Sequence, residues 1–286
     1  MTLKVGIIGG SGLYDLPGIE NKDEVTMDTP FGAPTDSLHT GTLKGVDMVF
    51  LPRHGRGHRI MPTAVPYRAN IWAMKKLGVT HIISVSAVGS LAEDYKPGDI
   101  AIVDQMIDRT RHRKDTFFEG GIVAHASLAD PICLPLAKLL YEAGVKLGLS
   151  MINGGIYVNM EGPQFSTRAE SNLYRSWGAH VIGMTNYTEA RLAREAEICY
   201  ATAALVTDYD CWHETEEAVD ATAVLKVMAQ NIENAKKIIV EVINKIPDEP
   251  VPGYSDAMAV AIVTQPDVIP DKIKKDLEPI IGKYIK

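Results

Sequence analysis

The sequence KVGIIGGSG at residues 4–12 joins a short apolar run to a cluster of glycines. The run favours a buried strand, and the glycines suit a tight turn whose backbone can approach an anion closely. Successive N–H groups in such a turn form a concave anion site, and Ser11 adds a hydroxyl. The spacing matches neither G-x-G-x-x-G nor a P-loop. A phosphate site and a purely structural turn are equally compatible with the stretch.

Short apolar runs alternate with segments of helical spacing along the rest of the chain. We expect helices at about 66–77, 134–147, 168–177, 189–197 and 220–246, and strands at about 48–51, 81–85, 100–103, 155–160, 180–184 and 198–206. This alternation is typical of an α/β domain with a largely parallel or mixed sheet. Prolines at 247–252 mark a joint. We therefore expect one domain over 1–246 and a C-terminal helical extension over 247–286 that packs on it.

Composition excludes several functional classes. The 286 residues carry a net charge of −7, whereas a nucleic-acid binder would show a basic surplus. An anionic substrate would need a local cationic pocket. The N-terminus does not resemble a signal peptide, and no apolar stretch reaches the roughly 20 residues that span a bilayer. We expect a cytoplasmic protein with neither a membrane nor a nucleic-acid partner.

The three cysteines are Cys133, Cys199 and Cys211. An odd count without a C-x-x-C pair argues against a disulfide framework and against a cysteine zinc site. We expect reduced thiols, as is usual in the cytosol.

Two polar motifs directly follow predicted strands. Ligands of open α/β sheets bind beyond the carboxyl ends of the strands, so both motifs are candidate site segments. Arg53-His54-Gly55 offers a guanidinium that matches phosphate geometry and an imidazole that can add a donor. SVSAVGS at 84–90 offers hydroxyls and small residues. The alternatives are a solvated arginine beside a core-packed histidine, and a small-residue turn.

Asp208 and Asp210 follow the long apolar run at 198–206. Carboxylates at i and i+2 point the same way from an extended backbone. Two neighbouring carboxylates raise the pKa of one of them, which can then protonate a leaving group. The alternatives are an Asx turn or helix cap, and a metal pair, for which the surrounding sequence lacks a clustered histidine pattern.

RTRHRK at 109–114 is a basic run. Such a run is usually a solvated loop, and that is our expectation for it. The alternatives are a subunit contact or a loop on the substrate side of the site.

Taken together, these motifs resemble those of the S-methyl-5′-thioadenosine phosphorylases, a branch of the trimeric purine nucleoside phosphorylase family. The resemblance runs from about residue 4 to 240 and is specific only in combination. It rests on GIIGGSGL at 6–13, PRHG at 52–55, NIWA at 70–73, EGPQFS at 161–166, RAE at 168–170 and TDYDCW at 207–212.

The resemblance implies a single α/β domain with a twisted mixed sheet flanked by helices, assembled as a homotrimer or a dimer of trimers. It implies a phosphate site made by Ser11, Arg53, His54, Ser86, Ala87 and Thr185. It places Met184 against the ribose and the base between Phe165, Ser166, Asp208 and Asp210. The 5′ pocket would be lined by His125 of a neighbouring subunit with Ala221, Val224 and Leu225.

The implied reaction is phosphorolysis of 5′-methylthioadenosine to adenine and 5-methylthioribose 1-phosphate. Inorganic phosphate is the co-substrate, and neither a metal nor an organic cofactor is implied. Asp208 would be the acid, with Asp210 adjusting its pKa. A broader purine nucleoside phosphorylase is the nearest alternative; a nucleoside hydrolase and a nucleotide-binding regulatory module are more distant ones.

One stretch departs from the family pattern. Relatives commonly carry proline before the glutamate that follows Met184-Thr185, whereas this chain has Asn186-Tyr187-Thr188-Glu189. We expect Thr188 to cap a helix that begins at Glu189.

Overall fold

The computed structural model describes residues 2–13, 15–213 and 221–285, except for the side chains of Ser11 and of residues 221–225. The described strands form one mixed sheet whose main path runs β2-β3-β4-β1-β5-β10-β9-β7. These strands are β1 (Lys4–Gly9), β2 (Ile19–Val25), β3 (Leu38–Leu43), β4 (Val46–Pro52), β5 (His81–Ser90), β7 (Gln105–Asp108), β9 (Ile156–Asn159) and β10 (Val181–Gly183). The predicted α/β class with a mixed sheet is confirmed.

A side branch of the sheet leaves the path at β5. There β11 (Cys199–Tyr209) pairs with β5 in parallel, and β6 (Ile100–Ile102) joins β11 to β8 (Met151–Asn153). Strands β1, β5 and β11 are buried along most of their length. Their near-continuous apolar sequences follow from that burial, because central parallel strands are covered on both faces.

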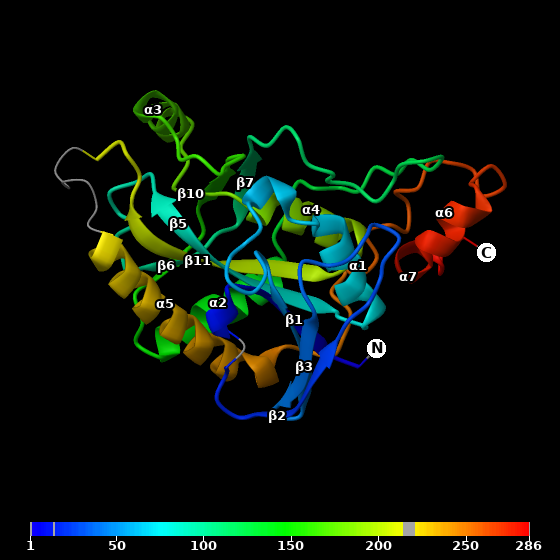
Figure 1. The fold of residues 1–286 in the computed structure, drawn as a ribbon, viewed down its shortest axis with the longest axis horizontal. Helices are drawn as coiled ribbons and strands as arrows, with labels where there is room; N and C mark the ends of the chain where they lie inside the picture. The colour runs from blue at the N-terminus through cyan, green and yellow to red at the C-terminus, as the bar shows by residue number, and fades with distance from the viewer. Residues whose placement is uncertain (1, 14, 214–220, 286) are drawn as a thin grey trace.

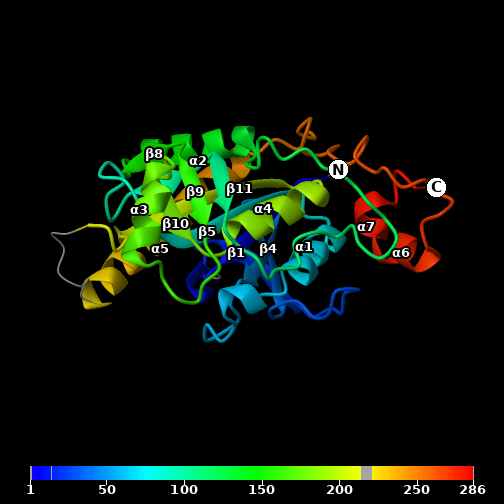
Figure 2. The ribbon, with the colours of Figure 1, turned by 90° about the horizontal axis from the view of Figure 1, so that it is seen from above.

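Helices cover both faces of the sheet, as Figures 1 and 2 show. On one face lie α2 (Leu134–Lys146) and α5 (Ala221–Val242), and on the other lie α1 (Tyr67–Lys76) and α4 (Asn186–Glu195). The helix α3 (Arg168–Ser176) stands at one end of the molecule and begins with a capping box between Thr167 and Glu170. No described helix combines the length and apolar character needed to cross a membrane.

The C-terminal region lies at the opposite end of the molecule (Figure 1), where α6 (Asp271–Asp276) and α7 (Glu278–Ile281) flank α1. Leu277, Ile280 and Ile281 join the main apolar core, and the Trp72 indole donates to the Asp276 carbonyl at 2.8 Å. The boundary at residue 246 stays a prediction.

The start of α4 differs from the expectation. The helix begins at Asn186, with Thr185 at the N-cap position, so the expectation that Thr188 caps a helix starting at Glu189 was wrong. An amide from another element satisfies a helix N–H here, because Asn159 at the end of β9 accepts from the Tyr187 N–H at 3.0 Å. Thr188 is a buried residue inside the helix.

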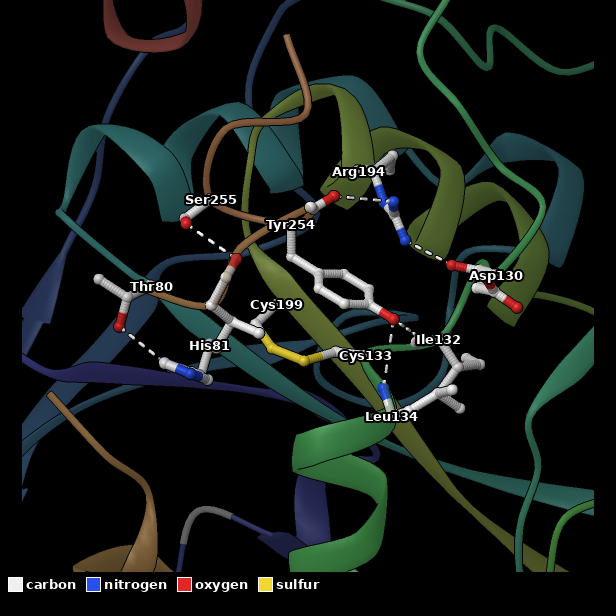
Figure 3. Close-up of a disulfide and its surroundings, with 12 residues drawn as sticks. Thr80, His81, Asp130, Ile132, Cys133, Leu134, Arg194, Cys199, Tyr254 and Ser255 are labelled. Carbon is white, nitrogen blue, oxygen red and sulfur yellow. Dashed lines mark hydrogen bonds between the residues drawn. A yellow bond between two sulfur atoms is a disulfide. The ribbon is translucent and has the colours of Figure 1, made fainter. Parts of the chain in front are cut away.

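The expectation of three reduced thiols was also wrong. Cys133, which precedes α2, forms a disulfide with Cys199 at the start of β11, and only Cys211 is free among the three. Both bonded cysteines are buried (Figure 3). The sequence offered no signal for this pair, because 66 residues separate its members and only the packing of α2 beside β11 brings their Cα atoms to 5.3 Å.

The segment around Tyr254 and Ser255, from the C-terminal region, lies beside the disulfide (Figure 3). The Tyr254 hydroxyl donates to the Ile132 carbonyl at 2.8 Å, and the Arg194 guanidinium lies 4.3 Å from the centre of the Tyr254 ring. The C-terminal region is therefore tied to both ends of the disulfide-bonded loop.

Replacing Cys133 and Cys199 together by alanine should lower the free energy of unfolding by about 4 kcal/mol, the loop-closure effect for a loop of this length. Urea unfolding of the variant and the parent measures this. Cys211→Ala is the matched control, because Cys211 is exposed, and it should change stability by less than about 0.5 kcal/mol. Unfolded, unreduced parent protein should show one free thiol; three would contradict the disulfide.

Candidate active site

The candidate site lies where two strands diverge along one edge of β5. Since β11 pairs with β5 along its whole length, β1 and β10 share the opposite edge, β1 at 81–84 and β10 at 89–90. Residues 85–88 are left between them. This is the kind of gap in which ligands of open α/β sheets bind. It brings residues 85–88 of β5 together with the segments after β1, β4 and β10, which carry the other predicted phosphate residues.

Arg53 lies beside this gap and contacts Ser84 and Val85 of β5. Its guanidinium is buried and forms a two-pronged ion pair with Glu189 of α4, with Nε–Oε1 at 2.5 Å and Nη2–Oε2 at 3.1 Å. Nη2 also donates to Ser84 Oγ at 2.6 Å, and Nη1 to the Val85 carbonyl at 3.0 Å. Burial opposes the charge, but Glu189 raises the pKa of Arg53 above its ordinary value. Most donors of Arg53 are thus used inside the protein.

Sequence reasoning missed Glu189 and Asn186 as site residues. Glu189 also accepts from Ser84 Oγ at 3.0 Å and from the Tyr200 hydroxyl at 2.9 Å. Asn186, which is fully buried, places its Nδ2 within 3.1 Å of three oxygens and accepts from Ser86 Oγ at 2.8 Å. The only sequence signal was that both lie in the stretch that departs from the family pattern.

Ser86 and Thr185 therefore lie on either side of one amide. The Thr185 hydroxyl is 3.5 Å from Asn186 Oδ1, the same atom that accepts from Ser86. Ala87, the next predicted phosphate residue, is exposed beside them. These three predicted residues are brought together.

His54 follows Arg53 at the end of β4 and is half-buried. Its Nδ1 lies 2.7 Å from the Ile60 carbonyl, and its ring stacks on His58 at 4.3 Å. Because a carbonyl only accepts, Nδ1 carries the proton and Nε2 is left as an acceptor. Burial lowers the pKa of His54 to about 4, so the ring is neutral near pH 7. In this tautomer Nε2 can accept a hydrogen bond, and the phosphate-binding role expected of His54 stays a prediction.

Asp208 and Asp210 lie at the other end of the gap. The strands β5 and β11 slip in register between Val206 and Asp208, which pairs Asp208 with Gly89. A Cβ on Gly89 would lie 3.3 Å from Asp208 Oδ1 and 3.5 Å from the Asp210 Cβ, so both aspartates flank this glycine. Asp208 accepts from the Thr207 hydroxyl at 2.6 Å.

Asp210 is the aspartate whose pKa is changed by burial. Burial raises the pKa of Asp210, and its Oδ2 has no hydrogen-bond partner among the described residues. No group of three or more His, Cys, Asp or Glu side chains in the described part of the chain is arranged to hold a metal ion.

The basic run at 109–114 is only partly a solvated loop. The Arg113 side chain is 1% exposed and donates to Glu161, at 3.2 Å to Oε1 and 2.8 Å to the carbonyl. It also donates to the Tyr67 and Thr188 hydroxyls at 3.1 and 3.2 Å. The solvated-loop expectation was therefore wrong for Arg113, whose long-range contacts no local pattern reveals.

Two of the predicted base-binding residues, Phe165 and Ser166, line a surface cavity of about 440 Å³ beside this loop. Phe165 is 82% exposed, and Ser166 Oγ lies 3.3 Å from Met160 Sδ. The Cys211 thiol donates to the Ser166 carbonyl at 3.3 Å, which connects this loop to the residue after Asp210. The cavity lining does not itself include Asp208 or Asp210.

Met184 covers the turn that leads into this loop. A Cβ on Gly162 would lie 2.6 Å from Met184 Sδ, and Gly162 has a φ of +69°, so only glycine suits this position. His125, by contrast, is exposed on a segment that pairs with residue 261 of the C-terminal region. It is not brought to the gap in β5 within one chain.

Comparison with known proteins identifies the family. The model of the phosphorylase superfamily matches residues 4–244. The chain belongs to the phosphorylase superfamily. It is 55% identical to an S-methyl-5′-thioadenosine phosphorylase from Geobacter sulfurreducens over 100% of both chains. It is 53% identical to one from Koribacter versatilis, over 99% of this chain and 97% of that one.

Solved structures agree with this membership of the phosphorylase superfamily. A methylthioadenosine phosphorylase from an antarctic soil metagenomic library superposes with a TM-score of 0.93 at 48% identity, covering 98% of this chain and 99% of that one. The Schistosoma mansoni methylthioadenosine phosphorylase in complex with adenine superposes with a TM-score of 0.81 at 34% identity, covering 98% of each chain.

Four residues assigned to the phosphorylase site remain outside the described side chains. They are Ser11, which the structure describes only as backbone in the short turn after β1, and Ala221, Val224 and Leu225 at the start of α5. Their predicted roles stay predictions.

Glu189→Gln should destabilise this phosphorylase by about 3 kcal/mol, because it leaves the buried Arg53 charge without its partner. Chemical denaturation measures the change. Glu142→Gln is the matched control: its ion pair with Lys138 on α2 is exposed, with a separation of 3.8 Å, and should contribute less than about 0.5 kcal/mol. Equal effects of the two substitutions would show that Glu189 does not anchor the site.

Proposed function

We propose that this chain cleaves 5′-methylthioadenosine by phosphorolysis, giving adenine and 5-methylthioribose 1-phosphate. One observation carries the proposal: a single strand, β5, presents a polar group for an anion at Ser86 and lies against Asp208 and Asp210 at Gly89. Three residues of extended chain span about 10 Å. That separation suits a nucleoside whose sugar faces phosphate and whose base faces the aspartates.

The chemistry follows from the charges at the two ends. Phosphate held beneath the anomeric carbon attacks a sugar that develops oxocarbenium character, and positioning of this kind can contribute several kcal/mol. The purine leaves readily only if its N7 is protonated. Asp208 is proposed to deliver that proton, and the raised pKa of Asp210 supports the pair as a proton store.

The aspartates also bear on substrate choice. A carboxylate accepts a hydrogen bond from the 6-amino group of adenine, whereas a 6-oxopurine presents an acceptor there. Leaving a buried polar group unpaired costs about 1–3 kcal/mol, so the pair favours adenine nucleosides. Ala221, Val224 and Leu225 are proposed to line an apolar 5′ pocket that prefers a methylthio group to a hydroxyl.

The proposed assembly is a homotrimer, or a dimer of trimers, acting in the cytoplasm. His125 is exposed on the segment that pairs with residue 261, and it is proposed to reach the 5′ pocket of a neighbouring subunit. Phosphate is proposed as the co-substrate, without a metal or an organic cofactor.

Release of adenine from methylthioadenosine should require inorganic phosphate. Purified protein is assayed with and without phosphate at constant ionic strength, with adenosine and inosine as comparison substrates. Equal rates without phosphate would replace phosphorolysis by hydrolysis, and a preference for inosine would replace the adenine specificity.

Asp208→Asn should lower kcat for methylthioadenosine by about 10²–10⁴, the usual contribution of a general acid. Turnover of methylthioinosine should fall less, because the amide can donate to a 6-oxo group. Asp210→Asn and the double variant belong in the same series, since coupled groups are not additive. Full activity of Asp208→Asn together with an inactive Asp210→Asn would transfer the acid role to Asp210.

A further inference from the structure

A network of buried polar side chains lies behind Ser86, and the chemistry of these groups fixes which atom donates in each hydrogen bond. Glu189 is the end point, because a carboxylate paired with a guanidinium only accepts. Ser84 and Tyr200 both donate their hydroxyl protons to Glu189 Oε2, at 3.0 and 2.9 Å. Burial and Glu189 raise the pKa of Tyr200, so its phenol stays protonated. Towards Asn186, these two hydroxyls can therefore offer only oxygen lone pairs.

That constraint settles which way the Asn186 amide faces. Its Nδ2 lies 3.1 Å from Ser84 Oγ, 3.0 Å from the Tyr200 hydroxyl and 2.6 Å from Thr202 Oγ1, so its two hydrogens are shared among three oxygens. The opposite orientation would set the amide oxygen against lone pairs. Oδ1 must then face Ser86, and since Oδ1 cannot donate, the hydroxyl proton of Ser86 points to Asn186 over 2.8 Å.

We propose that Asn186 is a specificity-determining residue that makes the anion site selective for a protonated oxyanion. It takes up the hydroxyl proton of Ser86, so that Ser86 presents only lone pairs to the bound anion. An oxygen that offers lone pairs attracts a P–OH group and repels a bare oxyanion. The inference rests on the proposed function, because it takes Ser86 to be a phosphate contact.

A second residue of the same site supports this. His54 donates its Nδ1 proton to the Ile60 carbonyl at 2.7 Å, which leaves Nε2 as another acceptor. The guanidinium of Arg53 is largely occupied by Glu189, Ser84 and Val85. Ser86 and His54 thus each offer an acceptor at this site.

The selectivity has a defined chemical consequence. Monohydrogen and dihydrogen phosphate carry at least one P–OH group near neutral pH, whereas sulfate carries no proton. Sulfate, which lacks a P–OH group, would leave the Ser86 acceptor unpaired, so the site should bind it more weakly than phosphate. The expected discrimination from one such contact is about 5- to 150-fold in the dissociation constant.

Isothermal titration calorimetry with sodium phosphate and sodium sulfate, at constant ionic strength, tests this without any nucleoside. The parent protein should bind phosphate at least about fivefold more tightly than sulfate. Ser86→Ala should weaken phosphate binding by about fivefold or more and leave sulfate binding unchanged or tighter. Equal loss for both anions would show that Ser86 donates and would overturn the proposal, as would the absence of phosphate binding by the parent.

Asn186→Ala frees the Ser86 hydroxyl to donate, so sulfate should bind more tightly and the ratio of the two dissociation constants should fall towards one. Asn70→Ala is the matched control: Asn70 is a buried amide on α1 that exchanges hydrogen bonds with Thr35 at 2.7 and 2.8 Å. It should lower stability but keep the parent's ratio. If Asn186→Ala keeps the parent's ratio of sulfate to phosphate dissociation constants, Asn186 has only a structural role and the proposal is overturned.

The proposed function and the role of Asn186 are tested by different measurements. Turnover of methylthioadenosine by the parent tests the proposed function, whereas the ratio of anion affinities tests the role of Asn186. A parent that turns over the nucleoside with phosphate and binds sulfate equally well would retain the function and overturn the inference.

Discussion

The buried carboxylate of Glu189 is the constraint on which the site depends. It accepts two hydrogen bonds from Arg53, one from Ser84 and one from Tyr200. An unpaired charge at this depth would be very costly, and these partners offset the cost of burying the carboxylate. The same carboxylate thereby ties α4 to the segment after β4 and to the central strands β5 and β11.

The position of Glu189 on its helix extends this constraint to the anion site. Asn186 and Glu189 are three residues apart on α4, so they share one face of the helix and both meet β5 and β11. The carboxylate orients the hydroxyls, the hydroxyls orient the amide, and the amide orients Ser86. The local arrangement of donors and acceptors, rather than the net charge of −7, decides which ligands the gap can accept.

The two ends of the gap have contrasting electrostatics. At Ser86 the charge of Arg53 is largely neutralised by Glu189, and acceptors are prominent. At Gly89 the pKa of Asp210 is raised by burial, which favours a retained proton. The first feature comes from polar groups buried beside β5 at the ends of β4 and β10, and the second from a carboxyl group buried just after β11.

Local pattern determined much of the fold by itself. Runs such as residues 4–8 and 198–206 are apolar because both faces of their strands are covered, and helical spacing and flanking glycines located α1, α2 and α3. The edge strand β2 and its neighbour β3 were not anticipated, since an exposed strand such as β2 has mostly polar residues. Polar motifs after strands pointed to Arg53, Ser86 and the aspartates, because strand ends converge in this fold class.

Only the tertiary structure decided how those residues are used. The disulfide joins Cys133 to Cys199, the buried ion pair joins Arg53 to Glu189, and Arg113 is buried against Glu161. The members of each pair are more than 40 positions apart in the sequence. Such contacts have no local signature, because periodicity reports which face of an element is buried but not which partner covers it. Sequence thus determined which chemical groups stand at the strand ends, and packing determined which of them donate and which accept.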